Sequence, residues 1–101
     1  MNVKVEELNG TYVATLQGEM DTAAALEVEE TLKPLFATGG KDVIIDCKEL
    51  EYIASSGLRI LLNILKGSKA TGSRVVMRNV NSDIKNVFKM TGLLGIFDFE
   101  N

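Results

Sequence analysis

The chain has 101 residues, of which 46% are hydrophobic and 25% charged, so it has room for one compact domain and excludes a second. Eleven basic residues against fourteen acidic ones give a formal net charge of -3. Because the basic residues are scattered, nucleic acid and anionic membranes are poor candidate partners. The chain holds one cysteine and no histidine, which excludes an internal disulfide, a Cys/His zinc cluster and a histidine base.

Signals of targeting or membrane insertion are also missing from the sequence. The N-terminus lacks the apolar core of a signal peptide, and no apolar run approaches the roughly 20 residues that cross a bilayer. We therefore expect a soluble, cytoplasmic protein that does not bind membranes, with a single domain over residues 1–101.

A β-hairpin is the first predicted element. Residues 3–8 and 12–16 are short runs with β-branched side chains, and Asn9-Gly10 between them accepts the positive φ angles of a tight turn. A helix is predicted next over residues 23–36, where apolar residues recur at helical spacing.

Signals at both ends support this first helix. Asp21 is placed to accept a bond from the first free N–H groups of the helix. Pro34 cannot donate to the carbonyl four residues earlier, so we expect the helix to kink or loosen there before Thr38-Gly39-Gly40 breaks it.

The central strand is predicted at residues 42–47. It contains three β-branched apolar residues in a row, as expected for a strand covered on both faces. The following stretch, 49–53, is interpreted as a trailing loop. A second, strongly amphipathic helix follows Gly57 and ends near Gly72, with leucines and isoleucines on one broad face.

The last elements are shorter. Residues 74–78 are predicted to form a strand, and Asn81 or Ser82 can cap a third helix that Gly92 ends. Residues 96–99 are predicted as a last strand at the edge of the sheet. The alternating order predicts an α/β fold, in which parallel strands are joined by right-handed crossovers and the hairpin adds an antiparallel pair. We expect a mixed sheet with three to four helices packed on it.

The polar stretch Ala54-Ser55-Ser56-Gly57 is the first candidate site, because its hydroxyls lie at the positive end of a helix dipole, which tolerates an added anion. The simpler interpretation is that Ser55 or Ser56 is an N-cap. A nucleophilic serine lacks support, because there is no histidine base and no flanking glycine of a nucleophile elbow.

Two carboxylates, Glu19 and Asp21, form the other polar cluster. Capping and solvation explain them, because the third ligand that a metal needs is not evident nearby. Cys47 is expected to be a buried, inert thiol. Met77 and Met90 are expected to fill the core. Neither a metal nor another cofactor is predicted.

Three segments carry a resemblance to a known family. Residues 44–58 closely resemble the STAS domain, in particular the bacterial anti-sigma factor antagonists. Residues 18–22 are similar to the family's Gly-Glu-Leu-Asp entry into the first helix. Residues 87–93 are similar to its closing pattern, Phe-x-Met-Ser-Gly-Leu. The three segments occur in the family's order and spacing, so the resemblance covers essentially the whole chain.

The resemblance implies a regulatory binding protein, not an enzyme, in a partner-switching pathway. The dephosphorylated protein would bind an anti-sigma factor serine kinase and release the sigma factor. Phosphorylation would occur on Ser55 in preference to Ser56 and would end that binding. A serine phosphatase would then return the protein to its binding form. The kinase would supply ATP. The protein itself is expected to be a monomer. Ala54 stands where the family usually has Asp. The implied partner-binding surface comprises Glu19, Asp21, Thr22, Ala54, Ser55, Ser56, Gly57 and Arg59.

Two alternatives stay open at this point. One is a STAS module that works without phosphorylation, as a structural or regulatory subunit of a transport or stress-signalling assembly, in which Ser55 is only a cap. The other is a small hydrolase that uses Glu19, Asp21 and Ser55, which would need a base of raised pKa that the sequence does not display.

Overall fold

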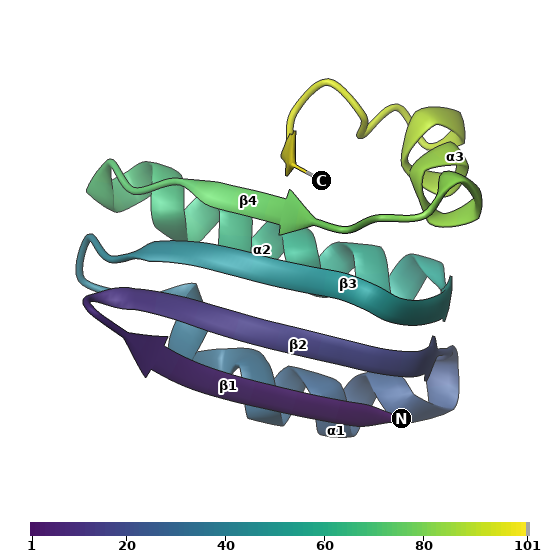
Figure 1. Cartoon of the computed structure of the whole chain (residues 1–101), viewed down its shortest axis with the longest axis horizontal. Helices are drawn as coiled ribbons and strands as arrows, with labels where there is room; N and C mark the ends of the chain where they lie inside the picture. Colours follow the sequence, from purple (N-terminus) through teal and green to yellow (C-terminus); the bar gives the residue numbers. More distant parts are fainter. Residues whose placement is uncertain (101) are drawn as a thin grey trace.

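The computed structural model describes residues 1–100 and has the predicted order of elements (Figure 1). The strands β1 to β5 form one sheet in that order, with β1 antiparallel to β2 and every other pair parallel. The α/β class and the N-terminal hairpin are therefore confirmed. The elements are β1 (Asn2–Leu8), β2 (Thr11–Met20), α1 (Thr22–Leu32), the 3-10 helix η1 (Lys33–Phe36), β3 (Asp42–Ile53), α2 (Ser55–Thr71), β4 (Val75–Arg78), α3 (Ser82–Met90) and β5 (Asp98–Glu100).

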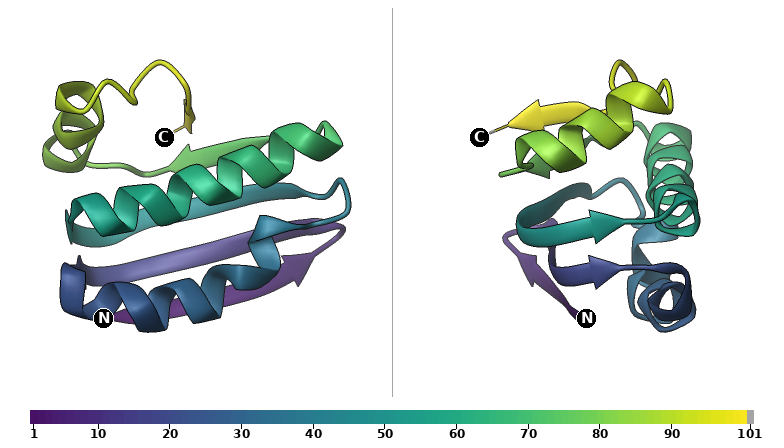
Figure 2. Two further views of the ribbon diagram at one scale, coloured as in Figure 1. Left: turned by 180° about the vertical axis from the view of Figure 1, so that it is seen from behind. Right: turned by 90° about the vertical axis from the view of Figure 1, so that its right-hand side faces the viewer.

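Helices α1 and α2 lie side by side on one face of the sheet, and α3 stands at the end next to β4 and β5 (Figure 1; Figure 2). Within residues 1–100, no helix covers the opposite face of β1 to β3 (Figure 2). Consequently β3 alternates: Val43 and Ile45 are fully buried, whereas Ile44 is half-buried. The prediction of a strand covered on both faces is wrong. Ile44 is sheltered by its neighbours in register, Val13 and Val76, and not by a helix.

Two strands extend further than predicted. Strand β2 ends at Met20, and β3 continues to Ile53 through the stretch that we interpreted as a loop. The register between the two strands shifts twice, which marks irregularities in their pairing. As a result, the buried residues at the end of β3 recur every third residue, at Cys47, Leu50 and Ile53, and this spacing hides the strand from a search for alternation.

The first helix is shorter than predicted. Helix α1 ends at Leu32, and Pro34 sits in the first turn of η1. A proline is accommodated there because its missing N–H would have no partner. The expected loosening at Pro34 is confirmed, and the α-helical stretch stops before it.

Aromatic contacts and the side-chain amide of Asn81 hold the C-terminal third of the chain together and join it to β3. Phe88 of α3 meets Phe97 and Phe99 edge to face, at 5.4 and 5.6 Å between ring centroids. The side chain of Asn81 accepts a bond from the N–H of Ile84 at 2.9 Å and donates to the carbonyl of Leu50 at 3.0 Å. Asn81 is therefore the cap of α3, and it also ties α3 to β3.

Two smaller expectations come out differently. Met77 is fully buried, but Met90 lies on the outer side of α3 and is 77% exposed, so its assignment to the core is wrong. The last strand is confirmed at the sheet edge, although it covers residues 98–100 in place of 96–99. Within residues 1–100 no helix is long and apolar enough to span a membrane.

Candidate functional site

The ends of β2 and β3 bring the two polar segments of the chain together. Met20 and Ile53 are partners in the parallel ladder, and the backbone N–H of Ala54 donates to the carbonyl of Met20 at 2.8 Å. Helices α1 and α2 begin directly after these strands. Because the carboxyl ends of parallel strands meet at one edge of a sheet, the two helix N-termini lie next to each other there. The predicted residues 19–22 and 54–59 are therefore neighbours in space.

The two helix starts are capped differently. The carboxylate of Asp21 accepts a bond from the N–H of Ala24 at 2.8 Å, as predicted. At α2 the cap position is Ala54, whose backbone is extended with φ -85 and ψ 169, and no side chain caps this helix. The prediction that Ser55 or Ser56 is the cap is wrong, because both already belong to the helix. The first N–H groups of α2 thus face the site without a side-chain acceptor.

The two serines differ in exposure. Ser55 is exposed at the first position of α2. Ser56 is half-buried, and its Oγ is shielded from solvent and has no hydrogen-bond partner among the described residues. Sequence reasoning could not separate these neighbours, because both occupy the helix start. Of the two serines, Ser55 is the more exposed residue.

A shallow groove runs between α1 and α2 beside the serines. Its volume is about 160 Å³. Leu26, on its rim, is 76% exposed. Six residues line the groove: Ala25, Leu26, Glu29, Ser56, Arg59 and Ile60. The groove thus combines an exposed apolar side chain with charges of both signs.

Gly57 has a packing role that the sequence pattern did not reveal. It is buried, and a Cβ built on it would collide with the sulfur of Met20 and lie 2.9 Å from Cγ1 of Ile53. Only a residue without a side chain lets α2 approach the ends of β2 and β3 this closely. Gly57 therefore lies beneath the predicted surface and shapes it from below.

The remaining predicted residues lie on the surface around Ser55. Asp21, Thr22 and Arg59 are exposed, and Ala54 is half-buried. Glu19 is exposed and pairs in register with Tyr52, which is 49% exposed. Sequence reasoning missed Leu26 and Tyr52.

A signal for these two residues exists, although it is weak. Both are large apolar side chains outside the buried pattern of their own elements, in which Ala25, Val28 and Ile53 point inward. Together with Ser55, Glu19 and Asp21 they give this edge of the sheet exposed apolar area next to carboxylates, a composition suited to binding a protein surface.

The structure gives the acidic residues no arrangement for metal chemistry. Within residues 1–100 no group of three or more Cys, Asp or Glu side chains is close enough to hold a metal ion. The carboxylate of Asp21 is used as a helix cap.

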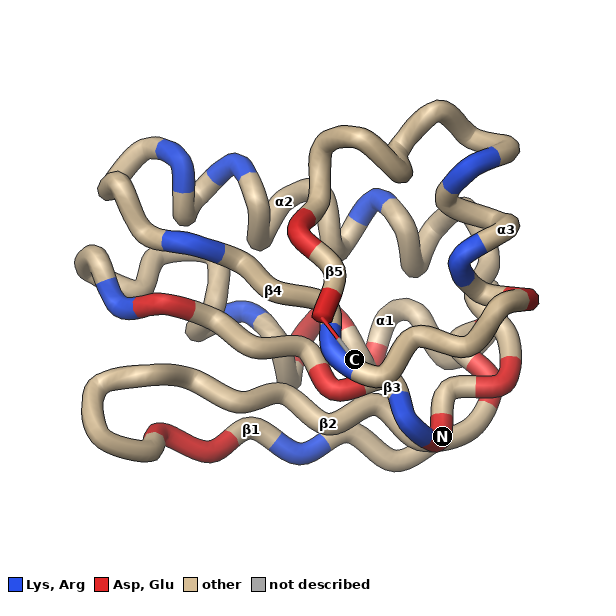
Figure 3. Tube along the Cα trace, turned by 45° about the horizontal axis from the view of Figure 1, so that its top comes forward, with Lys and Arg blue, Asp and Glu red and all other residues tan. Residues whose placement is uncertain are grey.

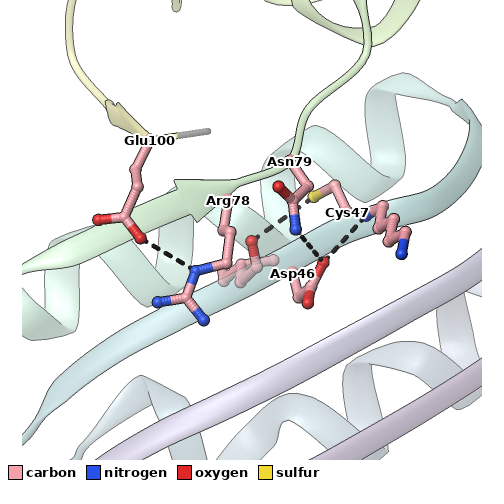
Figure 4. Close-up of polar contacts among 7 residues, drawn as sticks. Asp46, Cys47, Arg78, Asn79 and Glu100 are labelled. Carbon is pink, nitrogen blue, oxygen red and sulfur yellow. Dashed lines mark hydrogen bonds and ion pairs between the residues drawn. The ribbon is translucent and has the colours of Figure 1, made fainter.

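Cys47 lies in the middle of β3, next to a group of polar residues (Figure 4). Asp46 accepts bonds from the backbone N–H of Lys48 at 3.0 Å and from Nδ2 of Asn79 at 3.5 Å. The thiol of Cys47 is buried, and burial raises its pKa to about 12. Cys47 therefore stays a protonated, unreactive thiol, as we expect from the sequence.

Comparisons with known proteins agree with this geometry. The family model of the STAS domain matches residues 2–101. A Bordetella bronchiseptica protein named as a candidate anti-sigma factor antagonist, BtrV, is 30% identical over 101 residues, which cover 100% of this chain and 87% of that protein. These matches show that the chain belongs to the STAS domain family, and they confirm the resemblance to anti-sigma factor antagonists.

Solved structures share the fold. A candidate anti-sigma factor antagonist from Thermotoga maritima has a TM-score of 0.86 at 18% identity, with 98% of this chain and 86% of that one covered. The Bacillus cell fate determinant SpoIIAA in its phosphorylated form has a TM-score of 0.75 at 22% identity, with 99% and 92% covered.

Proposed function

We propose that this protein is an anti-sigma factor antagonist that works by partner switching. Its unphosphorylated form binds an anti-sigma factor serine kinase and so frees the sigma factor. The kinase transfers phosphate from its own ATP to Ser55, which ends the binding, and a phosphatase restores it. One observation carries the proposal: Ser55 is exposed at the start of a helix whose N-terminus no side chain caps.

The helix start suits a phosphoserine electrostatically. A phosphate on Ser55 would add about 1.5 to 2 negative charges, which the helix dipole and the free N–H groups of α2 stabilise. An aspartate at position 54 would compete for those N–H groups and repel the phosphate. Ala54 does neither.

The exposure of the two serines supports Ser55 as the acceptor. A kinase has to place the attacking hydroxyl in line with the γ-phosphate of ATP. Ser55 is an exposed residue, whereas Ser56 is half-buried and its Oγ is shielded from solvent. Phosphorylation of Ser56 would first require its hydroxyl to become accessible.

The switch then acts on the partner and leaves the fold unchanged. Leu26 lines the groove beside Ser56, and Tyr52 pairs with Glu19 at the end of β3; both side chains are exposed. Asp21 lies at the neighbouring helix start. A doubly charged group among them would have to be buried without a counter-charge when the partner docks. A loss of several kcal/mol of binding free energy is enough to dissociate a micromolar complex.

Site-resolved phosphopeptide mass spectrometry tests the proposal. The protein is isolated from growing and from stressed cells of its own organism with phosphatase inhibitors present. We expect phosphate on Ser55 with an occupancy that changes between the cultures, and its retention in Ser56→Ala but not in Ser55→Ala. If Ser55 is unmodified in every culture, the STAS module that works without phosphorylation is the better interpretation.

A further inference from the structure

Strand β1 leaves one edge of the sheet open. It lies at the end of the strand order and, within residues 1–100, pairs with β2 alone (Figure 1). It is seven residues long, whereas the strand at the other edge, β5, has three. An edge strand presents unpaired N–H and C=O groups to any further strand. The edge at β1 is therefore long enough for a second strand to add to it.

The turn of the hairpin determines which backbone groups face outward. Asn9 and Gly10 have φ angles of 53° and 81°, and Leu8 and Thr11 close the turn as partners. In such a two-residue turn the closing pair is hydrogen-bonded, and hydrogen-bonded pairs alternate along the ladder. The even-numbered residues of β1 therefore bond to β2. Val3, Val5 and Glu7 direct their N–H and C=O groups to the open edge.

Two of the three charged side chains of β1, Lys4 and Glu6, lie on the sheet face that α1 and α2 leave uncovered, whereas Glu7 lies on the other face and pairs with Lys41. Lys4 and Glu6 form an ion pair at 2.8 Å between Nζ and Oε1, with 73% and 43% of their side chains exposed. Val3 and Val5 lie on the other face, are half-buried and pack against the core. Figure 3 shows this strand with basic and acidic positions next to each other.

We propose that β1 pairs antiparallel with β1 of a second copy, about a two-fold axis at Val5. This arrangement sets Val5 opposite Val5 and Val3 opposite Glu7. The backbone N–H and C=O groups that point to the open edge of one copy therefore meet those of the other copy. It also sets Lys4 opposite Glu6 of the other copy, twice. The two pairs of Lys4 with Glu6 are non-hydrogen-bonded pairs of the ladder, in which side chains approach most closely.

The charges select this register over its neighbours. A shift that keeps outward groups opposite each other moves the axis to Lys4 or to Glu6. An axis at Lys4 places two lysines face to face, and an axis at Glu6 places two glutamates face to face. Like charges directly opposite destabilise a strand pair. Charges commonly protect an edge from pairing, but here they are self-complementary in one register.

The interface is confined to one strand from each copy, so it belongs to the small, reversible class of protein contacts. It differs from the monomer that we expect from the sequence. It lies along the side of the sheet, whereas Ser55 lies at the ends of β2 and β3. The dimer therefore does not depend on the proposed function, and each copy keeps its Ser55 surface free.

Analytical ultracentrifugation of the purified, unphosphorylated full chain over a wide concentration range tests the dimer. We expect Lys4→Glu and Glu6→Lys each to raise the dimer dissociation constant at least about tenfold, because each creates two like-charge pairs. The double variant, Lys4→Glu with Glu6→Lys, restores the dimer. An equimolar mixture of the two single variants forms a mixed dimer.

Lys66→Glu is the matched control, because it makes the same charge change at an exposed position of α2 and leaves the dimer intact. Far-UV circular dichroism checks that the exposed substitutions preserve the fold. A wild-type chain that stays monomeric at every concentration overturns the proposal. A dimer that survives either single variant, or that the double variant fails to restore, overturns it as well.

Discussion

The backbone N–H of Ala54 donates a 2.8 Å hydrogen bond to the carbonyl of Met20, which joins the last residue of β2 to the N-cap residue of α2. This bond sets the spacing between the two helix N-termini, because α1 begins one residue beyond Asp21 and α2 one residue beyond Ala54. The surface around Ser55 is thus assembled from two segments more than thirty residues apart by a strand pair.

A substitution can give the N-cap position of α2 a side chain that accepts hydrogen bonds. Ala54→Asp places a carboxylate where the backbone is already extended, so we expect the free energy of unfolding to rise by about 1 kcal/mol. Urea unfolding measures this change. Ser55→Ala is the control and shifts stability far less, because Ser55 is not the cap. An unchanged or lower stability of Ala54→Asp would show that the N–H groups of α2 are satisfied in another way.

A methyl group at position 57 disturbs the packing beneath the site. Gly57→Ala places a Cβ against the side chains of Met20 and Ile53, and we expect it to lower the free energy of unfolding by about 1 to 3 kcal/mol. Gly95→Ala is the matched control, because a Cβ there meets nothing within 4 Å. Thermal unfolding measures the stabilities of the two variants. Equal stabilities would contradict the close contact of Gly57 with Met20 and Ile53.

A permanent negative charge at Ser55 tests whether the switch leaves the fold intact. We expect Ser55→Glu to keep the near-UV circular dichroism of the wild type and to lose binding to the anti-sigma factor kinase of the same organism in calorimetric titration. Ser82→Glu adds the same charge at the first position of α3 and keeps binding. If Ser55→Glu loses its tertiary spectrum together with binding, a refolding mechanism replaces exclusion of the partner.

The burial of Cys47 makes stability depend on alkaline pH. Its pKa is raised from 9.0 to about 12 in the folded chain, chiefly by burial. Between these values the unfolded chain has lost the thiol proton and the folded chain retains it, so the free energy of unfolding falls as pH rises. We expect the drop in stability from about pH 8 to about pH 10 to be smaller in Cys47→Ala, because this variant lacks the thiol that causes it. Equal drops would show that the thiol titrates normally.

The order of the elements follows from local sequence signals. Asn9-Gly10 identifies the hairpin, Pro34 the weak point of the first helix and Gly92 the end of the last one, because each meets a backbone requirement within its own turn or helix. The second half of β3 escaped notice because its buried residues recur at an interval of three, set by irregular pairing with β2. That interval depends on a neighbouring strand and not on the strand's own sequence.

The candidate site was predictable in part. The neighbourhood of Asp21 and Ser55 follows from the family pattern, and the structure adds the strand pair that produces it. The cap of α2 was assigned to a serine because hydroxyls can cap, whereas the backbone angles place Ala54 in that position. The shielding of Ser56 depends on how α1 and α2 pack, which no local pattern encodes.

The close contact at Gly57 limits what can evolve next to Ser55. Because the interior of the protein requires a glycine two residues after Ser55, that position is not available for tuning a recognition sequence. Any enzyme that approaches Ser55 therefore meets a glycine two residues further along the chain. Selectivity among related pathways then has to reside in flanking side chains such as Leu26 and Arg59, which are exposed and free to vary without disturbing the core.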